Sequence, residues 1–486
     1  MTANLQQTLE WNKANADERE LLADLQGNIL KGHGRDFTHN LFLHFDVTKR
    51  EIAQKFVSDF AAEIPSALAQ LKGAEAFKSS NTDAGTFLSF FLTARGYGAL
   101  GRADLKPVLN AEPFEAGLKT RSAAFFDPDV VTWNEHFQAD IHAMLLIADD
   151  HEVVRNTKRA AVLSLISATD GAVSIVGEEE GRAMRNPDGH GIEHFGYVDG
   201  RSQPFALAED LREEDSKHGG TDRWSPKIEL SQLLVHSPGG DSANSYGSYF
   251  VFRKLEQNVR GFKKMEKQLA KFLKLGAGVD DPAKADNLEE LAGAMVIGRF
   301  ENGQPVALQD EAGNLKHKDV PNNFNYLKDD PKATKCPFAG HIRKSNPRGE
   351  SELKFRLEPG SEIRHLMARR GITYGQRVVS PNTPDLAFED MPTGDVGLLF
   401  MAYQSDLGNQ FEFTQQAWVN GPNFVQDGVG IDPVIGQAAT IAGQQWISKW
   451  GVSMNPARFD FSGFVTMLGG EYFFAPSLST LRALCR

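Results

Sequence analysis

Thr86-Phe-Leu-Ser-Phe-Phe-Leu-Thr93 is one of two short apolar runs that decide the fold of this chain. The second run is Asp140-Ile-His-Ala-Met-Leu-Leu-Ile-Ala148. Runs of this length, rich in aromatic and branched side chains and bounded by polar residues, are typical of strands. We therefore predict two apolar strands in the first third of the chain.

The segments around these runs complete a unit of four strands and two helices. Alternating or apolar stretches predict further strands at residues 40–46 and 172–177, and helical spacing predicts helices at residues 50–71 and 151–167. The resulting order is strand, helix, strand, strand, helix, strand. This order is the ferredoxin-like unit.

The second half of the chain is predicted to repeat the scheme, with strands at residues 247–253 and 395–403 and helices at 255–275 and 408–419. A ferredoxin-like sheet has one face covered by helices and the other free, and two such sheets bury their free faces by packing together. We therefore predict an α+β fold, a dimeric α+β barrel-like arrangement of two ferredoxin-like domains with antiparallel sheets face to face and helices at the periphery. The polar stretch from Asp210 to Asp222 places the domains at residues 1–225 and 226–486.

Composition limits the classes of protein to which the chain can belong. Its 486 residues, 41% apolar and 24% charged, indicate a globular protein with more than one domain. The net charge of −12 argues against a nucleic-acid partner. Two cysteines, Cys336 and Cys485, are too few for a disulfide scaffold or a structural zinc site. With no basic, apolar leader and no run of about 18 apolar residues, we expect a cytoplasmic protein without a membrane partner.

One histidine stands in the segment Cys336-Pro-Phe-Ala-Gly-His341-Ile-Arg-Lys-Ser-Asn-Pro-Arg348. A neutral imidazole is a good axial ligand for haem iron. No second histidine or cysteine follows at the spacing of a metal cluster, which favours haem over zinc or non-haem iron. Arg343, Lys344 and Arg348 follow the histidine and are candidates to meet the haem propionates.

Two further segments supply the polar groups that peroxide chemistry requires. Phe195-Gly-Tyr-Val-Asp199-Gly-Arg-Ser-Gln-Pro204 carries a carboxylate between two glycines, which would let a flat ligand approach the backbone. Arg364-His-Leu-Met-Ala-Arg369-Arg370-Gly-Ile-Thr-Tyr-Gly375 supplies arginines. Cleavage of peroxide needs a carrier that moves a proton between its oxygens and a fixed cation for the leaving oxygen.

These three segments, in this order, resemble the dye-decolorizing peroxidases. The GxxDG motif of that family falls on Gly196 to Gly200, its proximal histidine on His341, and its distal arginine on Arg369, with Arg370 as the alternative. Thr373 stands where the family usually has proline in a GIPYG-like turn. The opening DLQGNILKGHGR is also similar, and the length resembles the longer bacterial and fungal branch.

The resemblance implies one haem b per chain with His341 as the iron ligand. It implies an enzyme that reduces hydrogen peroxide and oxidises dyes, phenols and other aromatic one-electron donors, with Asp199 and Arg369 as catalytic residues. An acidic residue should accept a hydrogen bond from the proximal imidazole, and we expect Asp406, with Glu412 as the alternative. The other residues that the resemblance places at the haem are Gly200, Arg201, Ser202, Asn346, Pro347, Arg348, Leu398 and Phe400.

A haem-binding protein for storage or transfer, without significant turnover, is the alternative function. The same fold and the same His341 would serve it equally well. Asp199 and Arg369 favour the peroxidase, because storage requires neither a proton carrier nor a fixed cation over the iron.

Overall fold

The strands of the N-terminal half form the predicted ferredoxin-like unit in the computed structural model, which describes residues 2–273, 282–313, 320–383, 386–440, 442–451 and 453–486. They are β1 (Phe37–Phe45), β2 (Phe87–Leu92), β3 (Ala143–Asp149) and β4 (Val173–Arg182). All pair in antiparallel fashion, in the order β2-β3-β1-β4. Every residue of β2 and β3 is buried, which is why both read as continuous apolar runs.

Helices connect these strands, and one predicted helix is in fact two. The stretch predicted as a helix at residues 50–71 forms α2 (Arg50–Phe60), a short 3-10 turn and α3 (Ala67–Ser80). Pro65 disfavours a helical conformation at the residue before it, and the Ser66 side chain then caps α3 by accepting from the Ala69 N–H. The second predicted helix is α8 (Glu152–Ser167), as expected.

The C-terminal half repeats this strand order. Its path in the sheet is β10-β11-β8-β14, equivalent to the order of the first half. The strands are β8 (Tyr246–Gln257), β9 (Ala368–Arg369), β10 (Ile372–Tyr374), β11 (Gly397–Gln404) and β14 (Val465–Ala475). The helices are α10 (Val259–Phe272), α11 (Pro282–Ile297) and the π-type turns η10 (Gly408–Glu412) and η11 (Thr414–Val419).

The helix predicted at residues 255–275 begins later than expected, because β8 continues to Gln257 and the Asn258 side chain caps α10. Residues 274 and 275 of that prediction lie outside the described residues.

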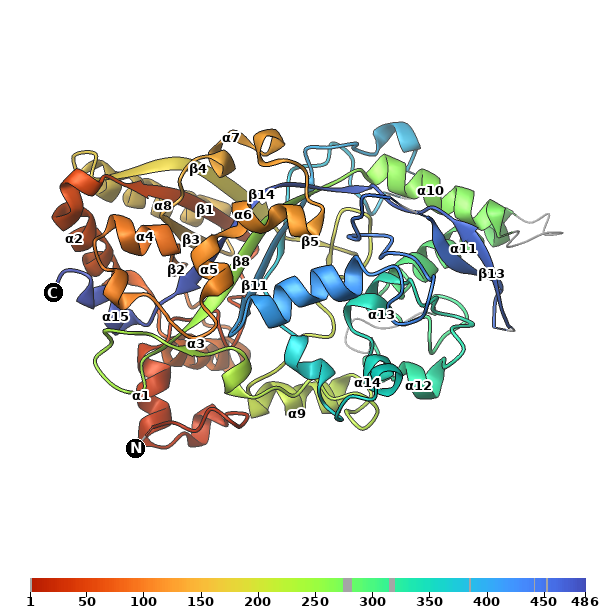
Figure 1. Cartoon of the computed structure of the whole chain (residues 1–486), viewed down its shortest axis with the longest axis horizontal. Helices are drawn as coiled ribbons and strands as arrows, with labels where there is room; N and C mark the ends of the chain where they lie inside the picture. Colours follow the sequence, from red (N-terminus) through yellow and green to blue (C-terminus); the bar gives the residue numbers. More distant parts are fainter. Residues whose placement is uncertain (1, 274–281, 314–319, 384–385, 441, 452) are drawn as a thin grey trace.

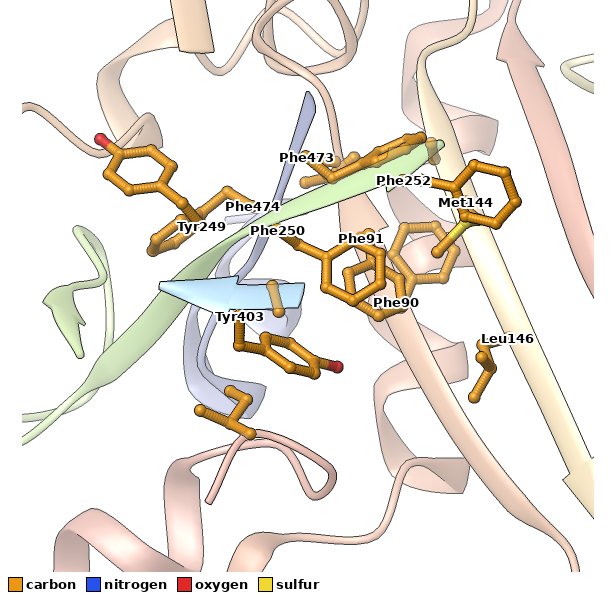
Figure 2. Packing of buried hydrophobic residues seen from close by; sticks show 14 of the residues in the cluster. Phe90, Phe91, Met144, Leu146, Tyr249, Phe250, Phe252, Tyr403, Phe473 and Phe474 are labelled. Atoms are coloured by element: carbon orange, nitrogen blue, oxygen red, sulfur yellow. The ribbon is translucent and has the colours of Figure 1, made fainter. Parts of the chain in front are cut away.

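A single sheet joins the two halves, through β14. This strand pairs with β8 along most of its length and with β2 at Phe474 and Leu92. The faces of the two halves then pack against each other, with the Phe42 and Phe252 rings 5.2 Å apart and the Phe91 and Phe250 rings 4.5 Å apart. Figure 2 shows this aromatic packing around Phe91, Phe250 and Tyr403.

The fold is therefore the predicted α+β arrangement, with one correction: the two sheets are continuous at β14. Among the described residues, no backbone ladder joins the outer strands β4 and β10, so the barrel is not closed. The Thr373 hydroxyl of β10 instead donates to the Arg182 carbonyl of β4. The division at residues 225 and 226 stays a prediction.

Helices lie toward both ends of the molecule. Figure 1 shows α2 and α8 at the end that holds both termini, and α9 (Ala208–Lys217), α12 (Tyr326–Asp329), α13 (His341–Ser345) and α14 (Glu350–Phe355) toward the other. In the described part of the chain, none of the helices has the length and apolar character needed to cross a bilayer. The elements not yet given are α1 (Ala16–Asp24), α4 (Ala94–Ala99), α5 (Glu112–Ala116), α6 (Leu118–Arg121), α7 (Glu135–Gln138), α15 (Leu478–Ala483), β5 (Met184–Arg185), β6 (Gly191–Ile192), β7 (Val235–His236), β12 (Gln444–Lys449) and β13 (Ser453–Phe459).

Candidate functional site

One cavity of about 280 Å³ is lined by residues of all three sequence segments. Asp199 comes from the segment after β6, His341 is the first residue of α13, and Arg369 ends β9. Pro347 is buried but does not line the cavity, and neither does Asp406. The other residues predicted at this site do line it: Gly200, Arg201, Ser202, Asn346, Arg348, Leu398 and Phe400.

The His341 imidazole is held by a carboxylate that the sequence prediction missed. Its Nδ1 lies 2.8 Å from Oδ2 of Asp432, a side chain with no exposed surface. The other Asp432 oxygen accepts the backbone N–H groups of Val434 at 2.7 Å and Ile435 at 3.0 Å. Nδ1 therefore carries the proton that it donates to Asp432, which leaves the lone pair of Nε2 for a metal.

The prediction that Asp406 or Glu412 holds this imidazole is wrong. Asp406 accepts from the Asn409 N–H at 2.9 Å and lies at a separate surface pocket. The buried Glu412 carboxylate accepts from Arg121 and, at 3.0 Å, from the Tyr472 hydroxyl. The sequence offered one signal for Asp432, because an aspartate before a proline favours the start of a turn.

The charges of the pair reinforce each other. Burial disfavours protonated His341, but the adjacent Asp432 carboxylate outweighs burial and raises the pKa of the imidazole. Burial likewise disfavours ionised Asp432, but His341 and the two backbone N–H groups outweigh it and lower the pKa of that carboxyl. The carboxylate is therefore anionic and makes the imidazole a more electron-rich ligand.

The Asp199 side chain is exposed to the cavity, in contrast to Asp432. Its backbone N–H donates to the Gly191 carbonyl at 3.0 Å, which fixes the main chain. The next residue, Gly200, has a φ of 78°, and Ser202 has a φ of 60°, so the chain turns sharply here. Within the described residues, no hydrogen bond restrains the Asp199 carboxylate.

Arg369, rather than Arg370, faces the cavity. Its Nη2 donates to the Arg201 carbonyl at 2.6 Å, and its backbone N–H donates to Oε1 of Gln203 at 3.1 Å. Arg370 donates to the Asn28 and Ile29 carbonyls instead, because neighbouring residues of an extended chain point to opposite sides. Burial lowers the pKa of Arg369, and the Asp199 charge opposes that effect.

Three other arginines, Arg201, Arg299 and Arg348, line the same cavity without a carboxylate at ion-pair distance among the described residues. Arg348 donates to Oγ of Ser202 at 2.7 Å and to Oδ1 of Asn322 at 2.8 Å, and Arg299 donates to the same Asn322 oxygen at 2.9 Å. Burial lowers the pKa of Arg348 to about 9 and that of Arg299 to about 10. Buried cations without counter-charges make this part of the cavity suited to an anionic group.

Arg299 and Asn322 carried no motif that could have marked them in the sequence. The expectation that Arg343 and Lys344 also face the propionates is wrong. Arg343 pairs with Glu350 and Asp330, whereas the Lys344 ammonium donates to two backbone carbonyls.

The donor set fits haem. His341 offers one nitrogen, the unpaired arginines suit two propionates, and the side chains of Leu398, Phe400 and their neighbours provide apolar walls. The buried Nδ2 of Asn346, also in the wall, has no hydrogen-bond partner among the described residues. A flat, apolar metal complex with anionic substituents would satisfy all of these groups.

Comparisons with known proteins agree with this geometry. No protein-family model matches the chain. The multifunctional dye peroxidase DyP2 of Amycolatopsis sp. is 44% identical over 100% of both chains, and its solved structure gives a TM-score of 0.90 over 99% of this chain and 100% of that one. A DyP-type peroxidase of Anabaena sp. is 39% identical, with a TM-score of 0.85 over 96% of this chain and 95% of that one. A dye-decolorizing peroxidase of the fungus Mycetinis scorodonius is 29% identical over 95% of this chain and 87% of its own length.

Proposed function

The chain belongs to the dye-decolorizing peroxidase family, and on this basis we propose that His341, Asp199 and Arg369 carry its reaction. As a member of this family it is a haem b peroxidase that reduces hydrogen peroxide and oxidises dyes and other reducing substrates. The observation that carries the residue assignment is the cavity itself. It joins a histidine with a buried carboxylate partner to an unrestrained carboxylate and an arginine.

His341 is proposed as the axial ligand, through Nε2. The hydrogen bond from Nδ1 to Asp432 fixes the tautomer and the orientation of the ring. Arg201, Arg299 and Arg348 are proposed to hold the propionates, since they bring positive charge without an ion pair to break. When bound, haem would supply the iron at which peroxide reacts, and it would hold the two oxidising equivalents that peroxide provides until they pass to one-electron donors.

Asp199 is proposed to accept a proton from the peroxide oxygen that faces the iron site and to return it to the second peroxide oxygen. The second oxygen then leaves as water. Its carboxylate suits this role because it is exposed to the cavity and free to turn. Arg369 is proposed to stabilise the negative charge that develops on the leaving oxygen. The contact of Arg369 with Arg201 holds the guanidinium in place before peroxide arrives.

Phenols and other aromatic donors are proposed as the reducing substrates beyond dyes. The storage or transfer function is not favoured, because the relatives that match nearly the whole chain are named as peroxidases, whereas two relatives named as deferrochelatases match only 26% of it. A cytoplasmic location and the absence of a nucleic-acid partner stay predictions.

An absorption spectrum tests the proposed function. After supply of haem, we expect a Soret band that changes with one equivalent of hydrogen peroxide and recovers on addition of a dye. A protein without a Soret band would contradict any haem-based function. A band that peroxide leaves unchanged would favour storage or transfer.

A further inference from the structure

Glu193 lies in the wall of the cavity, six residues before Asp199, and none of the sequence motifs includes it. Each of its carboxylate oxygens accepts a backbone N–H of the segment that leads to Asp199. Oε2 accepts from Phe195 at 2.7 Å, and Oε1 accepts from Tyr197 at 3.0 Å. The Glu193 side chain thus fixes the backbone of two residues, Phe195 and Tyr197, in the segment that leads to Asp199.

The same carboxylate ties this segment to the sheet. Gln257, the last residue of β8, donates from Nε2 to Glu193, and its Oε1 accepts the His194 N–H at 3.3 Å. The backbone of Gln257 is itself held by the Val396 carbonyl at 2.8 Å. From the other side, the Arg377 guanidinium donates to the His194 carbonyl at 3.0 Å. The segment is therefore anchored at Glu193 rather than free to move as a loop.

Stability alone does not account for a carboxylate here. Burial raises the pKa of Glu193 to about 7. The hydrogen bonds from the backbone N–H groups and from Gln257 favour the ionised form and lower the pKa, but burial outweighs them. The nearby Asp199 charge raises this pKa further, and among the described residues no cation forms an ion pair with Glu193. A partly buried carboxyl without a cationic partner beside a reaction site is costly to maintain, which points to a role in the reaction.

We propose that Glu193 is a positioning residue that fixes the place of Asp199 in the cavity. This inference rests on the proposed role of Asp199. The main chain of the segment is fixed at Phe195 and Tyr197 by Glu193 and at Asp199 by the Gly191 carbonyl, while the Asp199 carboxylate stays free to turn. A proton carrier works best when its backbone is fixed and its carboxylate can rotate between two oxygens.

The test is a double-mutant cycle with Glu193→Gln and Asp199→Asn in the haem-loaded protein. An amide of the same shape offers one acceptor oxygen and turns an NH₂ group toward the N–H donors, so the segment loses an anchor without losing volume. We expect kcat/KM for hydrogen peroxide, per bound haem, to fall about tenfold in Glu193→Gln, with kcat/KM for the dye unchanged. In the Asp199→Asn background, Glu193→Gln should cause no further loss.

Hydrogen exchange in the haem-free protein gives a second measurement that does not depend on activity. In Glu193→Gln, the Phe195 and Tyr197 amides should exchange faster than in the unmodified protein. Glu471→Gln is the matched control, because the buried Glu471 carboxylate also accepts two backbone N–H groups, from Leu118 and Tyr472, but lies away from the cavity. If Glu193→Gln folds poorly, Gln257→Leu removes the link to the sheet and should give the same changes to a smaller extent.

The outcomes separate this inference from the proposed function. If Asp199→Asn leaves the peroxide reaction unchanged, the proposed role of Asp199 is wrong. If Asp199→Asn slows the reaction while Glu193→Gln has no effect, or has the same effect in both backgrounds, the positioning role is wrong. A loss in Glu193→Gln that Glu471→Gln reproduces would also overturn it.

Discussion

The carboxylates of Asp432, behind the proposed ligand, and of Asp199, in the cavity, are held in opposite ways. Asp432 has no exposed surface and uses both oxygens, one for His341 and the other for two backbone N–H groups. Asp199 is exposed to the cavity, and only its main chain is tied down. The difference follows from the two proposed roles. Asp432, the partner of the ligand, must keep one orientation and one charge, whereas Asp199, the proton carrier, must change its orientation and its protonation state.

Removing the ligand should have the largest effect on this arrangement. We expect His341→Ala to abolish stable haem loading, because it removes the nitrogen that is proposed to bind the iron. The measurement is the Soret absorbance after supply of haem. The control is His365→Gln, because His365 also lines the cavity but bonds through Nδ1 to the Asn409 carbonyl. Normal loading of His341→Ala would refute the assignment of the ligand.

Asp199→Asn should bind haem normally but react with hydrogen peroxide about 10²–10⁴-fold more slowly. An amide cannot accept and return a proton, while its size and position are unchanged. Stopped-flow absorbance under excess peroxide measures this rate. A variant that reacts at the original rate would move the acid–base role to another residue.

Arg369→Met should slow the same reaction about 10²–10³-fold, because one fixed positive charge is lost. Arg370→Met is the matched control. Arg370 contacts the Asn28 and Ile29 carbonyls, so its loss should lower the melting temperature and leave the rate per bound haem unchanged. The opposite result, a slow Arg370 variant and a normal Arg369 variant, would exchange their roles.

Asp432→Asn should weaken haem binding by about 10–100-fold, because the partner of the ligand loses its charge. The iron should also become easier to reduce, since a neutral partner makes the imidazole less electron-rich. Haem titration and a redox titration measure the two effects. Glu412→Gln, which changes another buried carboxylate, the one paired with Arg121, should leave the potential unchanged.

Asp406→Asn should have the smallest effect. Its side chain accepts one backbone N–H, from Asn409, at the surface, and such substitutions change stability by about 0.5 kcal/mol or less. Haem affinity, potential and peroxide rate should all match the unmodified protein. A shifted potential in this variant would show that Asp406, not Asp432, tunes the ligand.

The parts of the site that could be predicted lie in short, local segments. His341, Asp199 and Arg369 each stand in a motif that can be recognised within about ten residues. Asp432 is 91 residues from His341 in the sequence, and only the fold brings the two together. Arg299 reaches the cavity in the same non-local way, and Asn322 orients Arg299 and Arg348 from behind, so neither pattern nor spacing marks them.

The fold shows the same limit. The apolar runs of β2 and β3 were sufficient to predict strands, because both faces of these strands are covered. β14 was missed, since Gly469-Gly470-Glu471 interrupts its apolar pattern. The reason for the interruption is tertiary: the Glu471 carboxylate accepts the Leu118 N–H at 2.9 Å.

The position of β14 has a consequence for biosynthesis. This strand joins both halves of the sheet, yet it is translated after every other strand in the described part of the chain. Until it emerges from the ribosome, β2 and β8 each lack a neighbour, and strands without partners invite aggregation. The edges of β2 and β8 are therefore covered only after more than four hundred residues of the chain have been made.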